Sequence, residues 1–329
     1  MEVFRTLVQP ASSEKKIRYN SQIIFSGSCF SENIGKKLEE AKFKVDNNPF
    51  GIVYNPLSVK HGLDRLMSEI SYTENDLFQQ EDMWCSFDHH SRFSDHSKVQ
   101  TLQNINTRLQ QASKTLKSAE FLFLTFGTSY VYELKSNNKV VCNCHKVPAN
   151  AFMRRKISVE EITIAYEKLL ENLFAFNPSL NIIFTVSPIR HWKDGAHESQ
   201  LSKSTLFLAI DHLCDKYKNA AYFPSFEIMM DDLRDYRFYD EDMLHPNTVA
   251  ISYIWQRFRD TFFSADTTNI LKEVEKVMQA FRHKPFNNST ESFQLFARQQ
   301  LEKINFLEDQ YKIDLQKETR YFKEFIKSY

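Results

Sequence analysis

The sequence predicts an α/β protein in which a parallel β-sheet is covered by helices on both faces. Two β-rich runs, Glu120–Phe126 (EFLFLTF) and Asn181–Ser187 (NIIFTVS), carry clusters of apolar residues without alternation, which is typical of strands buried on both sides. Such runs alternate along the chain with segments of helical periodicity, as in sheets whose strands are joined by helices. At 329 residues the chain can bury one large core and add an accessory segment.

The expected elements of this core follow one another in a regular order. Strands are predicted at Gln22–Ser26, Lys42–Val45, Glu120–Phe126, Asn181–Ser187 and Ala221–Phe223. Helices are predicted at Ser31–Ala41, Pro56–Ile70, Val99–Lys117, from Ser158 onward, at Gln200–Tyr217 and from Pro246 to about Phe262. Ser158 begins its helix with Glu161 three residues later, the pattern of a capping box. Between the third and fourth strands, a hairpin is expected around Ser136-Asn137-Asn138, joining Ser129–Leu134 to Val140–Cys144.

The chain changes character after residue 265. Asn269–Phe281 is predicted to form one helix, and His283–Thr290 a turn. From Phe293 onward, apolar residues recur at spacings of three to four residues or their multiples, at Phe296, Leu301, Ile304, Leu307, Tyr311, Leu315, Phe322 and Phe325. This pattern predicts a long amphipathic helix that packs either on the core of the same chain or on a second copy in a homo-oligomer. We therefore divide the chain into a main domain, 1–262, and a C-terminal helical extension, 263–329.

The composition excludes several classes of protein. Lys and Arg together number 42, as do Asp and Glu, so a dedicated nucleic-acid or anionic-membrane binder is not expected. No window approaches the ~20 apolar residues that span a bilayer. The start of the sequence lacks the apolar stretch of a secretory signal, and five cysteines indicate reduced thiols rather than a disulfide framework. We expect a cytoplasmic protein with no metal and no cofactor.

The first candidate for chemistry is the segment Gly27-Ser28-Cys29-Phe30-Ser31, which lies between a predicted strand and a predicted helix. A nucleophile at this position projects at the carboxyl end of the sheet, where open α/β folds bind ligands. The helix N-terminus supplies free N–H groups to an oxyanion and favours a thiolate. A helix-capping serine beside a buried cysteine would explain the same segment without any catalysis.

The second candidate is Asp242-Met243-Leu244-His245, just before the last core helix. In such a D-x-x-H pair the carboxylate can orient the imidazole, which then acts as a general base. The spacing alone is common. It becomes informative because a strand–Gly–nucleophile–helix segment lies far upstream.

Taken together, these segments resemble the GSCFA family. GSCFS at 27–31 is similar to the signature that gives the family its name, and six further motifs are similar to the family's: NPFGIVYNP (48–56), SFDHHSRFS (86–94), TFGTSYVYEL (125–134), NCHKVP (143–148), SPIRHWKDGAHESQLSK (187–203) and RDYRFYDEDMLHPN (234–247). The resemblance covers roughly residues 1–260. It implies a likeness to the SGNH (GDSL-like) hydrolases, which have a flavodoxin-like three-layer α/β fold and cleave esters.

The resemblance also implies roles for individual residues. Aligned on Gly27 without a gap, the SGNH nucleophile falls on Cys29, whereas a shift of one residue would place it on Ser28. We favour Cys29 because this register keeps the helix start in phase. Asp242 and His245 would complete a triad.

The oxyanion-binding residues implied by the resemblance are less well matched. Gly51 corresponds loosely to the glycine of the second SGNH block. Gly127 keeps the glycine of the third block, but Ser129 replaces its asparagine, and a hydroxyl can donate only one hydrogen bond. Asn55 and Asn143 are the candidates to compensate.

Several other polar residues could contact substrate. His89 and His90 of the Asp88-His89-His90 run either line the rim of the pocket or hold a loop in place, since the further acidic ligands of a metal phosphoesterase are not in register. His145 could bind an acyl or phosphate group or be structural. Arg190 follows a buried strand and could bind a substrate anion or form an ion pair.

These residues predict a hydrolase of the SGNH type that acts on an ester or acyl group, for which an acylated or acetylated carbohydrate is one candidate. The same residues could serve an acyltransferase that passes the acyl group to a sugar or other acceptor. A third alternative is a catalytically silent binding protein on the same fold. The identity of the substrate does not follow from the fold.

Overall fold

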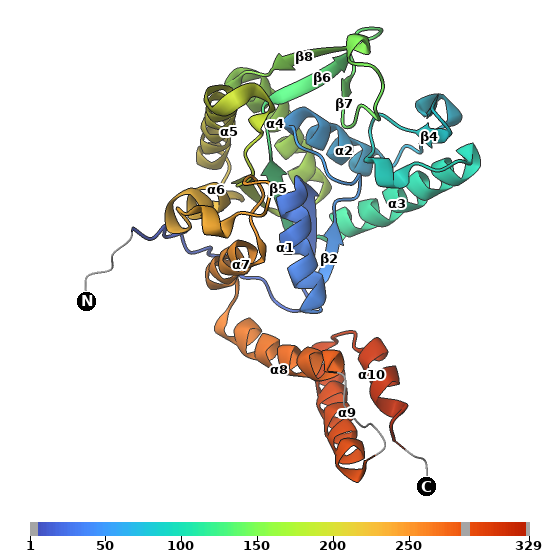
Figure 1. The fold of residues 1–329 in the computed structure, drawn as a ribbon, viewed down its shortest axis with the longest axis vertical. Coiled ribbons are helices and arrows are strands. Elements are labelled where there is room, and N and C mark those ends of the chain that lie inside the picture. The colour runs from blue at the N-terminus through green and yellow to red at the C-terminus, as the bar shows by residue number, and fades with distance from the viewer. Residues whose placement is uncertain (1–5, 284–289, 327–329) are drawn as a thin grey trace.

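The centre of the protein is a five-stranded parallel sheet with the strand order β10-β9-β5-β1-β2 (Figure 1). The computed structural model describes residues 6–283 and 290–326. The strands are β1 (Gln22–Gly27), β2 (Lys44–Asn47), β5 (Phe121–Phe126), β9 (Asn181–Val186) and β10 (Ala220–Tyr222). All four neighbouring pairs run parallel. Numbered within this sheet, the order is flavodoxin-like, and its direction of winding reverses between β1 and β5. The predicted α/β fold with a parallel sheet is confirmed.

Helices cover both faces of this sheet and make three layers. One face packs against α2 (Pro56–Ser68), α3 (Lys98–Ser118), α4 (Val159–Phe176) and α5 (Gly195–Lys216), and the other against α1 (Cys29–Glu40) and α7 (Thr248–Phe262). Side chains alternate across each strand, so Ile24 and Leu122 join the first apolar cluster while Ile23 and Phe123 join the second. Because both faces are covered, the inner strands β1, β5 and β9 are buried along most of their length, which explains their mostly apolar sequences.

Smaller elements surround the carboxyl edge of the sheet. A three-stranded antiparallel sheet contains β6 (Tyr130–Leu134), β7 (Val140–Val141) and β8 (Phe152–Lys156), and a hairpin contains β3 (Phe78–Gln80) and β4 (Met83–Cys85). Short helical turns lie at Glu74–Asp76, Ser91–Phe93, Ala149–Ala151, Trp192–Asp194, Ser225–Glu227 (α6), Ile228–Asp232 and Tyr236–Phe238. The β6–β7 pairing confirms the predicted hairpin. The strand β8 was not predicted, because its sequence FMRRK lacks a β-strand pattern.

The C-terminal extension is helical, but its helix is broken. Its helices are α8 (Ala265–Arg282), α9 (Glu291–Tyr311) and α10 (Gln316–Lys323). The prediction of one long helix from Phe293 is wrong, because Lys312 adopts a left-handed conformation (φ 55°) that ends α9 and turns the chain into α10. Most of the predicted turn at 283–290 lies outside the described residues.

The extension packs on its own chain, at the end of the molecule near α1 and α7 (Figure 1). Leu271, Ile304 and Phe322 are fully buried and belong to the same apolar cluster as α1 and α7. An ion pair of 2.8 Å joins Lys42, just after α1, to the buried Glu318 of α10. The apolar stripe predicted in the sequence is therefore used, at least in part, within the chain.

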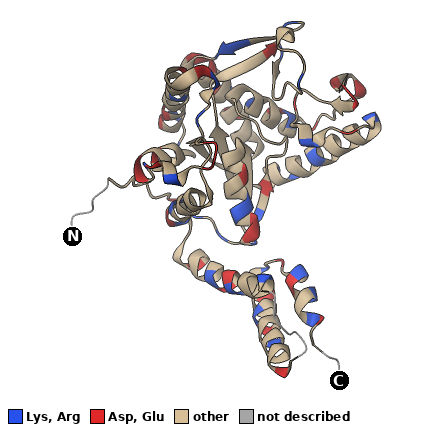
Figure 2. Ribbon diagram, viewed as in Figure 1, with Lys and Arg blue, Asp and Glu red and all other residues tan. Residues whose placement is uncertain are grey.

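Charged residues of both signs are interleaved over the core and the extension in the view of Figure 2, consistent with the zero formal charge. Within the described ranges, no helix combines the length and apolar character that crossing a membrane requires.

Candidate active site

The turn that ends β1 is shaped by a close approach between two strands. Gly27 has φ 147°, and a Cβ on it would lie 2.2 Å from the carbonyl oxygen of Thr125 in β5. Its N–H donates to Asn48 Oδ1 at 2.9 Å, and the next amide, that of Ser28, donates to Thr125 O at 3.1 Å. Only glycine fits here, and it lets the chain pass directly from β1 into α1 at the point where the strand order reverses.

Ser28 and Cys29 have different environments at this turn. Ser28 is 1 % exposed and is the N-cap of α1, where its Oγ accepts the N–H of Phe30 at 3.3 Å. Cys29 is the first residue of the helix and is partly exposed to a cavity of about 260 Å³. The structure therefore presents the thiol, and not the hydroxyl, to this cavity.

The cavity lies at the carboxyl edge of the sheet and collects residues from distant parts of the chain. Its walls include Cys29, Tyr54, Ser187, Arg190, His191 and His245. Ser187 and the residues after it follow the carboxyl end of β9, and His245 precedes α7. The two sequence motifs that carry the predicted chemistry thus meet in one cavity, as expected for a ligand site in an open α/β fold.

Asp242 holds His245 in this cavity wall. Asp242 Oδ1 accepts the backbone N–H groups of Leu244 and His245, each at 2.9 Å, and its Oδ2 contacts His245 Nδ1. These backbone and imidazole donors lower the pKa of the Asp242 carboxyl to about 2. Met243 adopts a left-handed conformation (φ 59°), which tightens the loop around the carboxylate. With Nδ1 engaged, Nε2 is the imidazole nitrogen left to exchange protons.

Burial controls the ionisation of Cys29. It raises the pKa of the thiol to about 11, against the backbone N–H groups of Cys29 and Phe30, which favour the thiolate. The negative charge of Glu32 raises the pKa further, while the positive charge of Lys203 lowers it. A base must therefore remove the proton before the sulfur can act as a nucleophile near neutral pH.

Comparisons with known proteins identify the family. Residues 22–258 match the GSCFA family model, and residues 274–328 match that of the GSCFA domain protein, C-terminal domain. The protein belongs to the GSCFA family. A comparison with curated proteins found no match.

Three solved structures are similar to this GSCFA protein. One is a family 3 carbohydrate esterase of Clostridium thermocellum, with 11% identity, 77% of this chain and 98% of that chain covered, and a TM-score of 0.34. A carbohydrate esterase family 3 protein of Talaromyces cellulolyticus has 8% identity, coverages of 78% and 99%, and a TM-score of 0.34. The acetyl xylan esterase Est2A of the rumen bacterium Butyrivibrio proteoclasticus has 11% identity, coverages of 74% and 63%, and a TM-score of 0.36.

The residues predicted to bind an oxyanion in this GSCFA protein have partners of their own. The amide of Gly51 donates to Asn48 O at 2.8 Å, and that of Gly127 donates to Tyr54 O at 2.7 Å. Ser129 is fully buried, and its hydroxyl donates to Ser202 Oγ at 3.1 Å. None of these three predicted residues lies among the described residues lining the Cys29 cavity.

Of the predicted substrate-binding residues, Arg190 lines the cavity and the others lie elsewhere. Its guanidinium carbon lies 5.0 Å from the ring centre of Trp192. Asn55 is the N-cap of α2, with its Oδ1 accepting the N–H of Ser58 at 2.8 Å. The Asn55 side chain is therefore engaged in starting a helix.

The three predicted histidines His89, His90 and His145 hold loops together. His89 is 2 % exposed among the rings of aromatic neighbours, and burial lowers its pKa to about 3. His90 accepts the N–H of Arg92 at 3.2 Å through Nδ1. His145 Nε2 donates to the backbone carbonyls of Ser86 and His89, at 2.8 and 3.0 Å. No group of metal-ligating side chains occurs in the parts of the chain that are described.

A second cavity, of about 410 Å³, adjoins the first, and its aromatic lining was not predicted. The two cavities share Arg190, Trp192 and Leu244, and the second also contains Tyr236 and Tyr239. Trp192 is 47% exposed and Tyr236 73%. Large aromatic side chains this exposed suit ligand contact better than core packing. In the sequence, the aromatic lining is indicated only by the positions of these residues, since Trp192 follows β9 and the two tyrosines precede Asp242.

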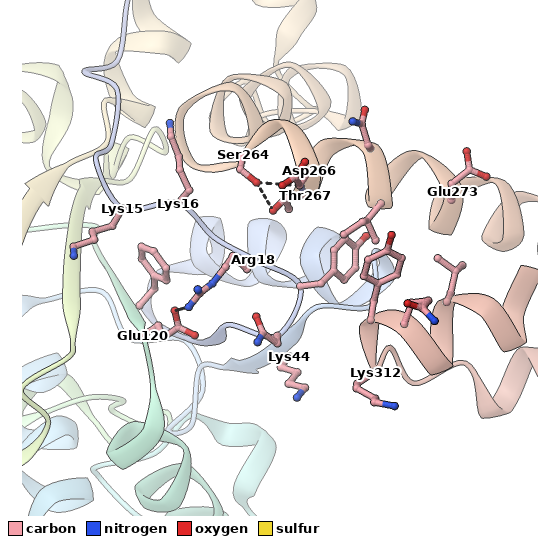
Figure 3. A pocket seen from close by; sticks show the side chains of 18 of the residues that line it. Lys15, Lys16, Arg18, Lys44, Glu120, Ser264, Asp266, Thr267, Glu273 and Lys312 are labelled. Carbon is pink, nitrogen blue, oxygen red and sulfur yellow. Dashed lines mark hydrogen bonds and ion pairs between the residues drawn. The ribbon is translucent and has the colours of Figure 1, made fainter.

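A larger hollow of about 1750 Å³ lies at the opposite edge of the sheet, between the amino ends of the strands and the C-terminal extension (Figure 3). Its charges are partly neutralised within the hollow, as in the 3.0 Å ion pair of Arg18 with Glu120. Ser264 and Thr267 are bonded to each other at the start of α8. Cys29 and His245 are both remote from this edge, so the chemistry is assigned to the carboxyl edge.

Proposed function

We propose that this GSCFA protein is a hydrolase that cleaves an ester through Cys29, His245 and Asp242. The observation that carries the proposal is that Cys29 and His245 line one cavity while Asp242 orients the imidazole. This arrangement has the three parts of a nucleophile–base–carboxylate triad. The position of Ser28, buried and capping α1, supports Cys29 as the nucleophile.

The reaction proceeds through a thioester. His245 Nε2 takes the proton from Cys29 Sγ as the sulfur attacks the ester carbonyl carbon. The bond between that carbon and the alcohol oxygen then breaks, and His245 returns the proton to the leaving alcohol. Water, deprotonated by His245, attacks the thioester; the carbon–sulfur bond breaks, the acid leaves and the thiol is restored.

We place the developing oxyanion at the N-terminus of α1, near the amide of Cys29. The helix is 12 residues long, and its first-turn N–H groups face the cavity end of the sheet. Gly51, Gly127 and Ser129 were predicted to contribute as well. To do so they would exchange their present partners Asn48, Tyr54 and Ser202 for the substrate.

The aromatic cavity supports an acylated carbohydrate as the substrate. Sugar rings bind proteins by stacking their C–H faces on aromatic side chains, and Trp192, Tyr236 and Tyr239 offer such faces beside the Cys29 cavity. Arg190, at the junction of the two cavities, can donate several hydrogen bonds to sugar hydroxyls or to the ester. The acyl group would then occupy the smaller cavity and the sugar the larger.

Trapping of the acyl-enzyme tests the proposed function. The protein is mixed with p-nitrophenyl acetate, quenched in acid and digested, and the acetylated residue is found by mass spectrometry. We expect acetyl on Cys29 in the wild type, much slower acetylation of Cys29 and much slower release of nitrophenol in His245→Ala, and no release of nitrophenol by Cys29→Ala beyond buffer. Equal activity of Cys29→Ala and wild type would refute the triad. Transfer of the acetyl group to an added sugar, with no free acetate, would replace the hydrolase by an acyltransferase.

We also propose a reducing, cytoplasmic location. All five cysteines are free, including Cys29, which must remain a thiol to react.

The C-terminal extension, 263–329, is proposed as an accessory domain that braces α1 and could mediate a homo-oligomer. Lys42 and Glu40, at the end of α1, form ion pairs with Glu318 and Arg282 of the extension, at 2.8 and 3.8 Å. Phe306 on α9 is 55% exposed and could contribute to contact with a second copy.

A further inference from the structure

Lys203 is a buried amine at the carboxyl edge of the sheet. It lies on α5, is 2 % exposed, and its Nζ donates to Gly127 O at 2.8 Å and Ser187 O at 2.7 Å. These carbonyls directly follow β5 and β9. No carboxylate in the described parts of the chain forms an ion pair with Lys203, although buried lysines are rarely left without one.

The surroundings of Lys203 couple its charge to Cys29. Burial lowers the pKa of Lys203 to about 7, the negative charge of the Cys29 thiolate raises it, and the positive charge of Arg190 lowers it. His191, Asp194 and Tyr130 line a small cavity beside Lys203. Burial lowers the pKa of His191 to about 4, helped by the charge of Lys203, while Asp194 is paired with Arg154 and Tyr130 with Glu198. The two carbonyl acceptors and the face of Phe226, 5.7 Å from Nζ, favour the ammonium form. Ser187, whose carbonyl accepts from Lys203 Nζ at 2.7 Å, lines the same cavity as Cys29, so the ammonium lies directly behind the wall that the thiolate faces. A thiolate at Cys29 is therefore the anionic group that Lys203 can stabilise.

We propose that Lys203 is the internal cation that stabilises the Cys29 thiolate, and with it the anionic intermediate. This inference rests on the proposed function in that it assigns a use to a thiolate at Cys29. Lys203 acts through the electric field at the nucleophile and is a positioning residue. Because it sits behind the cavity wall, its charge is little screened by solvent, unlike that of a surface lysine.

A charge that titrates near the nucleophile leaves a measurable signature. The rate of alkylation by iodoacetamide depends on the thiolate fraction. For an isolated thiol at a pH below its pKa, this rate rises about tenfold for each unit by which the pH increases. At Cys29 the protonated Lys203 raises the thiolate fraction at low pH, and this help fades as Lys203 loses its proton. We expect the alkylation rate of Cys29 to rise by less than tenfold per pH unit from about pH 7 upward. The same dependence on pH is expected in His245→Ala.

Two variants of Lys203 test the assignment. Lys203→Met removes the charge and the donors, whereas Lys203→Gln removes the charge and keeps two amide hydrogens for the carbonyls. Alkylation at each cysteine is followed by peptide mass spectrometry from pH 6 to 10. Both variants are expected to react about tenfold more slowly at Cys29 at pH 6.5, with a smaller difference at pH 10. Cys214, on the same helix but far from the sheet edge, should react at an unchanged rate.

The controls separate this inference from the proposed function. Lys216→Met removes an exposed positive charge from the same helix, where Lys216 pairs with Glu167 at 2.8 Å, and is expected to leave the Cys29 profile unchanged. If a folded Lys203 variant alkylates Cys29 with the same pH dependence as the wild type, the inference is overturned. It is also overturned if the alkylation rate of Cys29 in the wild type rises uniformly by tenfold per pH unit through pH 7. Neither measurement depends on turnover, so ester hydrolysis by Cys29→Ala would refute the triad and leave this test standing.

Discussion

Asp242 and His245 are bonded through both the backbone and the side chain of the histidine. One carboxylate oxygen accepts the backbone N–H of His245 at 2.9 Å, and the other contacts imidazole Nδ1. A single carboxylate therefore sets the position of the backbone, the tautomer and the ring orientation. This explains how a half-exposed pair on a loop can keep one geometry.

Asp242→Asn should disable this arrangement without removing the histidine. The asparagine amide can present N–H to Nδ1, which favours the tautomer with the proton on Nε2 and so blocks the base. We expect kcat for p-nitrophenyl acetate to fall by roughly 10²–10⁴. Asp240→Asn, in the same exposed loop, is the matched control and should keep wild-type kcat. Equal kcat for Asp242→Asn and the control would contradict the role of Asp242.

Ser28→Ala and Cys29→Ala should have opposite effects. Ser28→Ala removes the N-cap of α1 and should lower the free energy of unfolding by about 1 kcal/mol while esterase activity persists. Cys29→Ala should abolish activity and leave the stability nearly unchanged. Urea unfolding and initial rates on the same preparations measure both quantities. An inactive Ser28→Ala beside an active Cys29→Ala would move the nucleophile to Ser28.

Trp192→Ala tests the sugar-binding role of the aromatic cavity. Loss of the indole face should raise KM for an acetylated sugar by about tenfold, equivalent to ~1.4 kcal/mol of binding. KM for ethyl acetate, which has no ring to stack, should stay within a factor of two or so. Phe306→Ala, which removes an exposed aromatic side chain on α9, serves as the control. Equal changes in KM for both esters would exclude stacking on Trp192.

His89 should make the fold sensitive to acid. Its pKa is about 3 in the folded protein and about 6.5 in the unfolded chain, so below pH 6.5 the unfolded chain binds more protons. The stability contributed by the neutral imidazole is complete above pH 6.5 and is lost as the pH falls from there toward 3. His89→Phe should therefore lose less stability between pH 7 and 4, by on the order of 2 kcal/mol.

Urea unfolding at several pH values measures this difference. His96→Phe, at an exposed histidine, is the control and should lose as much stability as the wild type. The same loss in His89→Phe and the control would show that His89 does not carry the acid sensitivity.

Gly27→Ala should damage the fold through steric overlap with β5. Its Cβ would meet Thr125 O at 2.2 Å, whereas a Cβ at Gly195, which also has positive φ (83°), meets nothing within 4 Å. We expect Gly195→Ala to cost about 1 kcal/mol and Gly27→Ala on the order of 3 kcal/mol or more. Thermal unfolding of the pair separates overlap from backbone strain. Similar melting temperatures of Gly27→Ala and Gly195→Ala would show that β5 can shift to accommodate the added Cβ with little loss of stability.

The core, and the two motifs that meet at the cavity, could be predicted from the sequence because both depend on local patterns. Strands buried on both faces are apolar throughout, as in β5, and the D-x-x-H pair is complete within four residues. The strand β8 could not be predicted, because its arginines form ion pairs with acidic residues that are distant in the sequence. Arg154 pairs with Asp194, and Arg155 pairs with Glu133. The break after α9 depends on the single left-handed residue Lys312, a conformation that lysine rarely adopts.

The walls of the site were harder to predict for a similar reason. Tyr54, Trp192 and Leu244 belong to three loops that meet only when the sheet has formed. The hydrogen bonds that occupy the amides of Gly51 and Gly127 also arise from tertiary structure. The complete burial of Lys203 could not be inferred either, because lysine side chains are rarely buried.

Cys29 and His245 line one cavity but lie near opposite ends of the core in the sequence, and this separation has a consequence for biosynthesis. Cys29 emerges from the ribosome early, while His245 follows only after nearly the whole core has been translated, about 10 to 40 s later at ordinary elongation rates. Until then β1 lacks its neighbour β5 or the cover of α7, and the thiol has no base. If Cys29 and His245 act together as proposed, a nascent chain that ends before His245 would be unable to cleave an ester, and the activity would begin only after the last core helix has been made.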